Sequence, residues 1–182
     1  VAERTQRSYP YGSLAAHVVG YTGTVTSDQL NSMDSSDEGA VHYSSGDTVG
    51  QSGVELQYES VLQGVAGEQT VYVDADGNVL DYSTYVEPRS GSDVVLTLDM
   101  DVQKAAEESL VKVAEYQQKA GYSATGACAV AIDCTNGEVI AMASYPTYNP
   151  SIFVGGISTS DWESLQSEDA NYPLMNRAIS GQ

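Results

Sequence analysis

The first half of the chain alternates short β-rich runs with turn-forming and polar stretches. Residues 15–21 are rich in apolar residues and β-formers, and they predict a strand after a turn that Pro10 and Gly12 mark. The stretch 27–53 is rich in Ser, Asp and Gly, which predicts a loop. Apolar residues then recur at helical spacing, so a short helix is expected at about 53–62.

A hairpin and a linker are predicted next. The runs 70–73 and 79–80 are β-rich and flank an Asp-Gly turn, where glycine accepts positive φ without strain. The segment 87–92 carries Pro, Gly and Ser and is the predicted linker between two parts of the chain. The apolar run 94–98 predicts a buried strand after that linker.

The longest predicted helix covers about 101–120. Asp99 or Asp101 is suited to cap its start, because a carboxylate accepts hydrogen bonds from the free N–H groups of a first helical turn. Its solvent face should carry two Glu-to-Lys pairs four residues apart, at 108–112 and 115–119. Its buried stripe is predicted to contain Val102, Ala106, Leu110 and Val113.

A second hairpin is predicted from 127–132 and 139–143, which flank Asn136-Gly137. Both strands are apolar on both faces, so we expect them in a sheet that is covered on both sides. The chain after Pro146 reads as irregular, with a short helix-like segment around Trp162. The whole pattern indicates an α+β fold.

The net charge of the chain argues against certain classes of binding partner. Seven Lys and Arg against 25 Asp and Glu give a formal net charge of −18. Such a surface repels phosphate backbones and anionic lipids, so we expect no nucleic-acid partner. No apolar run reaches the roughly 18 residues of a membrane-spanning helix.

The first hairpin turn carries the residues that most resemble a metal site. Asp74, Asp76 and Asn78 resemble the start of a calcium loop, but an EF-hand needs Gly and Glu where the chain has Val79 and Tyr85. A hairpin turn explains the same residues, and we expect neither a metal nor another cofactor.

The histidines and cysteines offer little chemistry. Within one strand Cys128 and Cys134 would lie roughly 20 Å apart, too far for a disulfide, so we expect two buried or unpaired thiols. His17 lies in an apolar run and is expected to be a hydrogen-bonded core residue. For neither His17 nor His42 does the sequence fix a nucleophile partner that would support a catalytic pair.

One apparent catalytic motif is a coincidence. Ser109 and Lys112 match Ser-x-x-Lys, and residues 119–121 resemble Lys-Thr-Gly. Ser109 is expected in the middle of a helix, and Lys112 is explained by its pair with Glu108. One helix cannot supply both walls of a transpeptidase cleft, so we expect no catalytic residue in the chain.

Four stretches, in order, resemble the class B penicillin-binding proteins. The first is 7–21 (RSYPYGSLAAHVVGY) and the second is 50–64 (GQSGVELQYESVLQG). The third is Leu-Thr-Leu-Asp at 96–99 with Gln103. The fourth runs from 136–146 (NGEVIAMASYP) through Tyr-Asn-Pro at 148–150 to Asn-Arg-Ala at 176–178. The resemblance covers nearly the whole chain.

The resemblance implies a fold and a division into domains. Residues 1–90 would be the C-terminal part of the hairpin-rich pedestal, often called the dimerisation domain. Residues 91–182 would be a strand–helix–hairpin segment from the edge of the transpeptidase domain, ending before the catalytic Ser-x-x-Lys. The chain would then be a non-catalytic piece of a peptidoglycan cross-linking enzyme. The alternative is a free-standing extracytoplasmic binding module with no role in wall synthesis.

The resemblance also implies a location and partners. The parent protein would lie on the extracytoplasmic face of the bacterial plasma membrane, held by an N-terminal anchor. Its pedestal would contact the rest of the transpeptidase domain and a SEDS-type glycosyltransferase. Apolar positions of the second hairpin would be uncovered in this piece, so a homodimer or a strand-swapped assembly is expected.

Residues in the matching motifs are the candidate functional positions. Arg7 and Glu55 stand out, because a bidentate contact between them could hold the first motif against the second. The alternative is a pair of exposed side chains that contributes little to stability. The other candidate positions are Tyr9, Pro10, Gly12, His17, Gly50, Gly53, Tyr58, Asp99, Gln103, Asn149, Pro150, Asn176 and Arg177.

Overall fold

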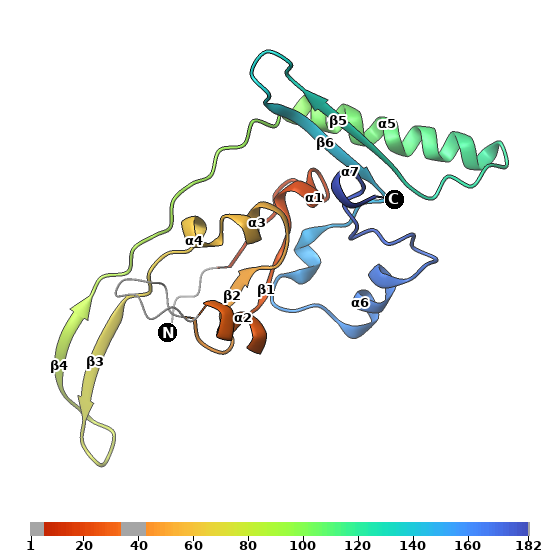
Figure 1. The fold of residues 1–182 in the computed structure, drawn as a ribbon. Coiled ribbons are helices and arrows are strands. Elements are labelled where there is room, and N and C mark those ends of the chain that lie inside the picture. The colour runs from red at the N-terminus through yellow and green to blue at the C-terminus, as the bar shows by residue number, and fades with distance from the viewer. Residues whose placement is uncertain (1–5, 34–42, 182) are drawn as a thin grey trace.

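The computed structural model describes residues 6–33 and 43–181 and shows a mixture of helices and short strands. In the described part of the chain the strands form three two-stranded antiparallel sheets. One hairpin projects at one end of the molecule, and a long helix packs on another hairpin at the opposite end (Figure 1). The strand pairs are β1 (Thr22–Thr24) with β2 (Thr48–Gly50), β3 (Glu68–Val73) with β4 (Val79–Val86), and β5 (Ala127–Ile132) with β6 (Val139–Tyr145).

The strand predicted at 15–21 is wrong. This segment forms the one-turn helix α1 (Ala16–Val19), and β1 begins only at Thr22. Ala15 enters the helix in the left-handed region at φ 56°, and Gly20 leaves it at φ 84°. The helical turn directs Ala16 and His17 into the core, and this tertiary packing overrides the β-propensity of the run.

The loop predicted at 27–53 is wrong in part. It contains α2 (Ser27–Met33) and β2, while residues 34–42 lie outside the described part of the chain. A capping box begins α2, because Gln29 N–H donates to Thr26 Oγ1 at 3.2 Å and Thr26 N–H donates back to Gln29 Oε1 at 3.0 Å. The Thr-x-x-Gln spacing of this capping box is visible in the sequence and marks the start of a helix.

The predicted helix at 53–62 exists as two short helices. They are α3 (Gly53–Gln57) and α4 (Glu59–Leu62), and Tyr58 separates them with φ −111° and ψ 20°. The first predicted hairpin is confirmed, with longer strands than the sequence indicated. Its turn is held by Asp74, whose carboxylate accepts the N–H groups of Asp76 and Asn78 at 2.9 and 2.8 Å.

The predicted strand at 94–98 is wrong, although the chain there is extended. It has no ladder partner among the described residues, and Val95 is 92% exposed. Thr97 Oγ1 donates to Val139 O at 2.7 Å, and Asp99 N–H donates to Ile140 O at 2.9 Å. These bonds attach the segment to β6 without forming a ladder.

The long helix is confirmed as α5 (Met100–Lys119), with Asp99 as its cap. Both Glu-to-Lys pairs form, each at 3.6 Å. The predicted buried stripe is wrong in part, because Val102 is 41% exposed and Val113 is 57% exposed, whereas Gln103 and Ala114 are buried. Gln103 occupies the packing face because its amide bonds to the backbone of β6.

The second hairpin, β5–β6, is also confirmed. Helix α5 packs on β6, where Ala141 and Ala143 are buried. In β5, however, Val130 is 46% exposed and Ile132 is 58% exposed, so the expectation of cover on both sides is wrong for the described chain. Beyond it lie the 3-10 turn η1 (Pro150–Phe153), α6 (Thr159–Gln166) and α7 (Arg177–Ser180).

The aromatic core joins the beginning of the chain to its end. Ala16, Tyr148 and Phe153 are buried together, and Phe153 stacks on Tyr21 with ring centroids 3.7 Å apart. Tyr148 Oη donates to the backbone oxygen of Ala16 at 3.1 Å. Partly buried residues enclose this cluster, namely Ile157, Trp162, Leu165 and Leu174.

A pair of glycine substitutions tests how closely α3 approaches α1. Gly53 and Gly12 both have φ +58°, but a Cβ on Gly53 would lie 2.5 Å from Val18 O, whereas one on Gly12 would have its nearest atom at 3.9 Å. Gly12→Ala should lower the free energy of unfolding by the strain of the left-handed backbone, about 1–2 kcal/mol. Gly53→Ala should cost about 1–3 kcal/mol more, because backbone must move. Urea denaturation measures both, and equal losses would contradict the close approach.

Candidate functional site

Arg7 and Glu55 form a bidentate ion pair that connects the first and second motifs. Arg7 Nε donates to Glu55 Oε1 at 2.6 Å, and a terminal guanidinium nitrogen donates to Oε2. The Glu55 side chain is 6% exposed and that of Arg7 is 41% exposed. The hydrogen bonds to Glu55 raise the pKa of Arg7, although burial acts in the opposite direction. The pair therefore fastens the N-terminal segment to the first turn of α3.

Two glycines make this position of Glu55 possible. A Cβ on Gly50 would lie 2.1 Å from Glu55 O, and one on Gly53 would lie 2.7 Å from Gly20 N. Larger residues would separate α3 from β2 and from α1. The glycines of the second motif therefore set the distance across which Arg7 must reach.

A second glutamate lies beside the pair. Glu59 Oε2 accepts the N–H of Gly50 at 2.7 Å, and Glu59 Oε1 accepts the Tyr43 hydroxyl at 3.3 Å. Burial is the main cause that raises the pKa of Glu59, and it also raises the pKa of Tyr43 to about 12. The cluster thus holds two carboxylates near one guanidinium.

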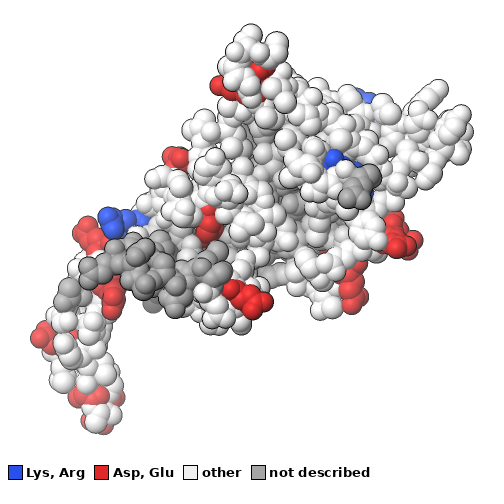
Figure 2. Space-filling view, in the orientation of Figure 1, with Lys and Arg blue, Asp and Glu red and all other residues white. Residues whose placement is uncertain are grey.

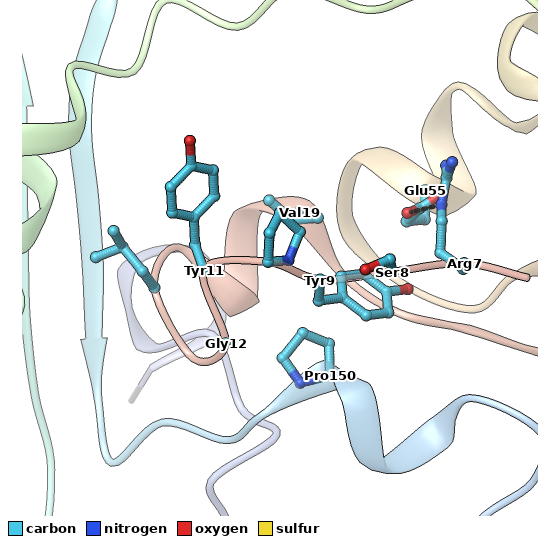
Figure 3. A pocket seen from close by; sticks show the side chains of 10 residues that line it. Arg7, Ser8, Tyr9, Tyr11, Gly12, Val19, Glu55 and Pro150 are labelled. Atoms are coloured by element: carbon cyan, nitrogen blue, oxygen red, sulfur yellow. Dashed lines mark hydrogen bonds and ion pairs between the residues drawn. The ribbon is translucent and has the colours of Figure 1, made fainter.

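An open pocket of about 260 Å³ adjoins the pair. Figure 3 shows Arg7 and Glu55 at one end of the pocket and Tyr11 at the other. Tyr9 is held in place because its hydroxyl accepts the N–H of Thr22 at 3.1 Å, and burial raises the pKa of Tyr9. The other lining residues are Ser8, Pro10, Gly12, Leu14, Val19 and Pro150.

His17 lies in the core and contacts the far end of the chain. Its Nε2 is 2.7 Å from Pro173 O, so this nitrogen carries the proton that is donated to the carbonyl. Its ring meets Tyr148 edge to face at 5.2 Å between centroids. Burial is the main cause that lowers the pKa of His17. These contacts are those of a structural histidine.

Gln103 and Glu107 connect α5 to β6 and to the first motif. Gln103 is fully buried; its Nε2 donates to Met142 O at 3.0 Å, and its Oε1 accepts Met142 N–H at 2.8 Å. Glu107 Oε1 accepts from Gln103 Nε2 at 2.8 Å and from Ala15 N–H at 2.8 Å. A single carboxylate oxygen therefore joins α5 to the first motif.

The remaining candidate positions shape local structure. Asn149 and Asn176 cap η1 and α7, accepting the N–H groups of Ser151 and Ala178 at 3.0 and 3.1 Å. Pro150 is fully buried at the start of η1. Tyr58 is 44% exposed at the junction of α3 and α4.

Arg177 lies among backbone groups near the end of the chain. Its guanidinium donates to Asn171 O at 2.5 Å, and its own N–H donates to Ser144 Oγ at 3.0 Å. A Cβ on Gly126 would lie 2.2 Å from Arg177 Nε, so this glycine makes room for the side chain. The candidate positions therefore form several packing contacts rather than one cleft.

A metal site or a covalent catalytic site would require specific groupings of side chains among the described residues. Among residues 6–33 and 43–181, no group of three or more His, Cys, Asp or Glu could hold a metal ion. Ser109 Oγ donates to Ala105 O at 2.6 Å within α5, as expected of a mid-helix serine. Cys128 and Cys134 are unpaired, and both are exposed. None of the helices in these residues is both long and apolar enough to cross a membrane.

Several structural residues were not singled out from the sequence. Glu107, Tyr148 and Ser144 bond to segments that are distant in sequence, and Glu59 bonds to β2 nine residues away. Glu107 carried a weak signal, since it follows Gln103 by four residues on the same helix face. The other three lie inside the matching stretches, but nothing in the sequence indicated which backbone groups or side chains they would contact.

Comparison with known families decides the identity. The model of the penicillin-binding protein dimerisation domain matches residues 1–96. The chain belongs to this family. The relatives of this dimerisation-domain chain include the peptidoglycan D,D-transpeptidase MrdA of Acinetobacter baumannii, 38% identical over 175 residues, which are 96% of this chain and 23% of that protein. The MrdA of Escherichia coli is 35% identical over 176 residues, 97% of this chain and 26% of that protein.

Solved structures of penicillin-binding proteins share the fold. PBP2 of Helicobacter pylori in complex with MreC matches with a TM-score of 0.71 and 33% identity, over 94% of this chain and 29% of that one. PBP2 of Pseudomonas aeruginosa matches with a TM-score of 0.63 and 32% identity, over 99% of this chain and 32% of that one. The chain spans about a quarter of the length of the curated relatives that it matches.

A double-mutant cycle tests the ion pair. Arg7→Met should destabilise the protein strongly, because it leaves the buried Glu55 carboxylate unpaired, and Glu55→Gln should restore part of that loss. We expect a coupling of about 1–2 kcal/mol, above the ~0.2–1 kcal/mol of exposed pairs and limited by the exposure of Arg7. Urea denaturation of the four proteins measures it.

The matched control is Glu108 with Lys112, an exposed pair at 3.6 Å, whose coupling should be below about 0.5 kcal/mol. Equal coupling in the two cycles would contradict the role of Arg7.

The buried histidine predicts a pH dependence. The folded-state pKa of His17 lies below its usual value of 6.5, so the unfolded chain binds the proton more readily. Its contribution to stability is complete above the unfolded pKa and is lost as the pH falls through the folded pKa. The stability advantage of the wild type over His17→Gln should therefore shrink between pH 7.5 and 5.5, measured by urea denaturation. A constant difference would show that His17 does not couple folding to protons.

Proposed function

We propose that this chain is the positioning part of a peptidoglycan transpeptidase. Residues 1–90 would be the C-terminal part of the pedestal, and residues 91–182 would begin the transpeptidase domain, ending before its catalytic serine. The match of the dimerisation-domain model to residues 1–96 supports the first assignment. The MrdA relatives, which align over 96% of the chain or more, support the second.

The observation that carries the proposal is the packing across the proposed boundary. Ala15 bonds to Glu107, His17 to Pro173, and Ala16 to Tyr148, at 2.8, 2.7 and 3.1 Å. Three consecutive residues of the pedestal motif thus contact α5 and two separate loops of the second part. A pedestal attached in this way would set the orientation of the reactive domain without touching the substrate.

The chemistry would belong to the rest of the longer protein. A serine beyond residue 182 would attack the D-Ala–D-Ala end of a stem peptide, form an acyl-enzyme and transfer the acyl group to a neighbouring amine. The chain itself would contribute no catalytic residue, no metal ligand and no cofactor site. The whole protein would act on the extracytoplasmic face of the plasma membrane.

Partners of the chain would be other wall-synthesis proteins. One similar solved structure is a PBP2 in complex with MreC, and another is a chain of a peptidoglycan synthase complex. By the family resemblance, a SEDS-type glycosyltransferase would be a further partner. The exposed Val130 and Ile132 of β5 support the additional proposal that the isolated chain self-associates through β5–β6, as a homodimer or a strand-swapped assembly.

Labelling with a fluorescent penicillin tests the assignment. The chain as given should not be labelled, because Ser109 lies within α5 and its hydroxyl is bonded to Ala105. The longer product of the same gene should be labelled at a serine outside residues 1–182. Penicillin pretreatment is the control and should abolish the signal. If the isolated chain were labelled and Ser109→Ala removed the label, the chain would be an enzyme in its own right; a longer product that resists labelling would contradict the transpeptidase assignment.

A further inference from the structure

The β3–β4 hairpin has one apolar face and one mixed face. Direct cross-strand partners share a face, so the register places Val71 with Tyr82, Val73 with Val79, and Gln69 with Tyr85 on one side. The opposite side carries the pairs Tyr72–Asp81 and Glu68–Val86. The hairpin is therefore an amphipathic two-stranded sheet.

The apolar face is uncovered in the described part of the chain. All six residues of β3 are exposed, and the apolar members of the face are each at least 39% exposed. The hairpin projects from the rest of the molecule (Figure 1), and it joins the body through the isolated bridge between Val65 and Arg89. A contiguous apolar face of this kind marks an interaction surface.

The charges around the face select its partner. Between residues 66 and 88 the chain has no Lys or Arg, and it carries Glu68, Asp74, Asp76, Asp81 and Glu87. In Figure 2 the projecting hairpin is mostly uncharged surface with acidic side chains at its tip. An anionic membrane would be repelled, and so would a second copy of this hairpin. The complementary partner is apolar with a cationic rim.

The dimensions of the face indicate the kind of element that covers it. Two strands lie about 5 Å apart, so with their side chains the face is about as wide as one α-helix, whose diameter is about 10–12 Å. A strand of six residues is roughly 20 Å long, which is the length of about 13 helical residues. Layered packing of a helix on a sheet would bury this face.

We propose that the apolar face of β3–β4 binds an amphipathic helix of another protein whose apolar stripe is flanked by Lys or Arg. This inference deepens the proposed function, because it assigns the pedestal a contact surface and the chemistry of its partner. The acidic residues at the ends of the hairpin orient the helix, and the valines and tyrosines of the face supply the buried contact.

The test uses the whole chain and a short helical peptide of leucine and lysine as the probe. Fluorescence anisotropy measures its binding, and hydrogen–deuterium exchange locates it. We expect saturable binding that protects residues 68–86 and weakens as salt rises. Tyr82→Ser should weaken binding about tenfold, as for an aromatic residue at the centre of an interface. Tyr72→Ser is the matched control on the opposite face and should leave the affinity unchanged.

Other results would overturn the proposal. Equal affinity for the wild type and Tyr82→Ser would mean that the peptide binds the acidic surface at large. Equal binding of a leucine–glutamate peptide would remove the role of charge. Self-association that Tyr82→Ser abolishes, measured by sedimentation, would make a second copy the occupant, and Tyr82-dependent binding to anionic vesicles would make it a membrane. None of these results depends on penicillin labelling, so the transpeptidase assignment would stand or fall separately.

Discussion

The structure depends on how the segment from Arg7 to Gly20 is held from two directions. On one side, Arg7 pairs with the nearly buried Glu55, and the backbone around Gly20 lies against Gly53. On the other side, the one-turn helix α1 bonds to α5, to Tyr148 and to Pro173. Ala16 lies within this segment and is buried in the core cluster with Tyr148 and Phe153, so both sets of contacts position one member of the core. The first motif is thus the common element of the whole fold.

This arrangement explains why packing, rather than reactivity, unites the candidate residues. Most of them cap a helix, permit a close backbone approach or bond to a distant main-chain group. Gln103 is an example. Its fully buried amide donates to the backbone oxygen of Met142 in β6 and accepts the N–H of the same residue. A buried polar group satisfied in this way fixes the register of two elements more strictly than an apolar contact would. The geometry suits a part of a protein that must hold its shape.

Regular elements with strong local signals were predictable from the sequence, and elements defined by tertiary contacts were not. The Glu-to-Lys pairs of α5 and the turn of each hairpin follow from spacing alone; the sequence offered Asp99 or Asp101 as the helix cap, and the structure has Asp99 in that role. Helix α1 could not be predicted, because its β-rich sequence forms a helical turn only where Glu107 of α5 accepts the N–H of Ala15 and the Tyr148 hydroxyl donates to the backbone oxygen of Ala16. The strand prediction at 94–98 was wrong for the complementary reason. An apolar run forms a strand only when a ladder partner is present, and this run has none among the described residues. Arg7 and Glu55 were found through the resemblance of their motifs, and Glu107, with a backbone partner 92 residues away, was not singled out.

The shared oxygen of Glu107 has a consequence for how such proteins can diversify. The linker predicted at residues 87–92 would be a natural point at which to exchange one module for another. Yet Ala15 and Gln103, on opposite sides of that stretch, donate to the same atom. A recombined gene joined at the linker would combine surfaces that had not evolved to fit, however intact each half remained. The two halves are consequently expected to be inherited together, with changes in one compensated by changes in the other.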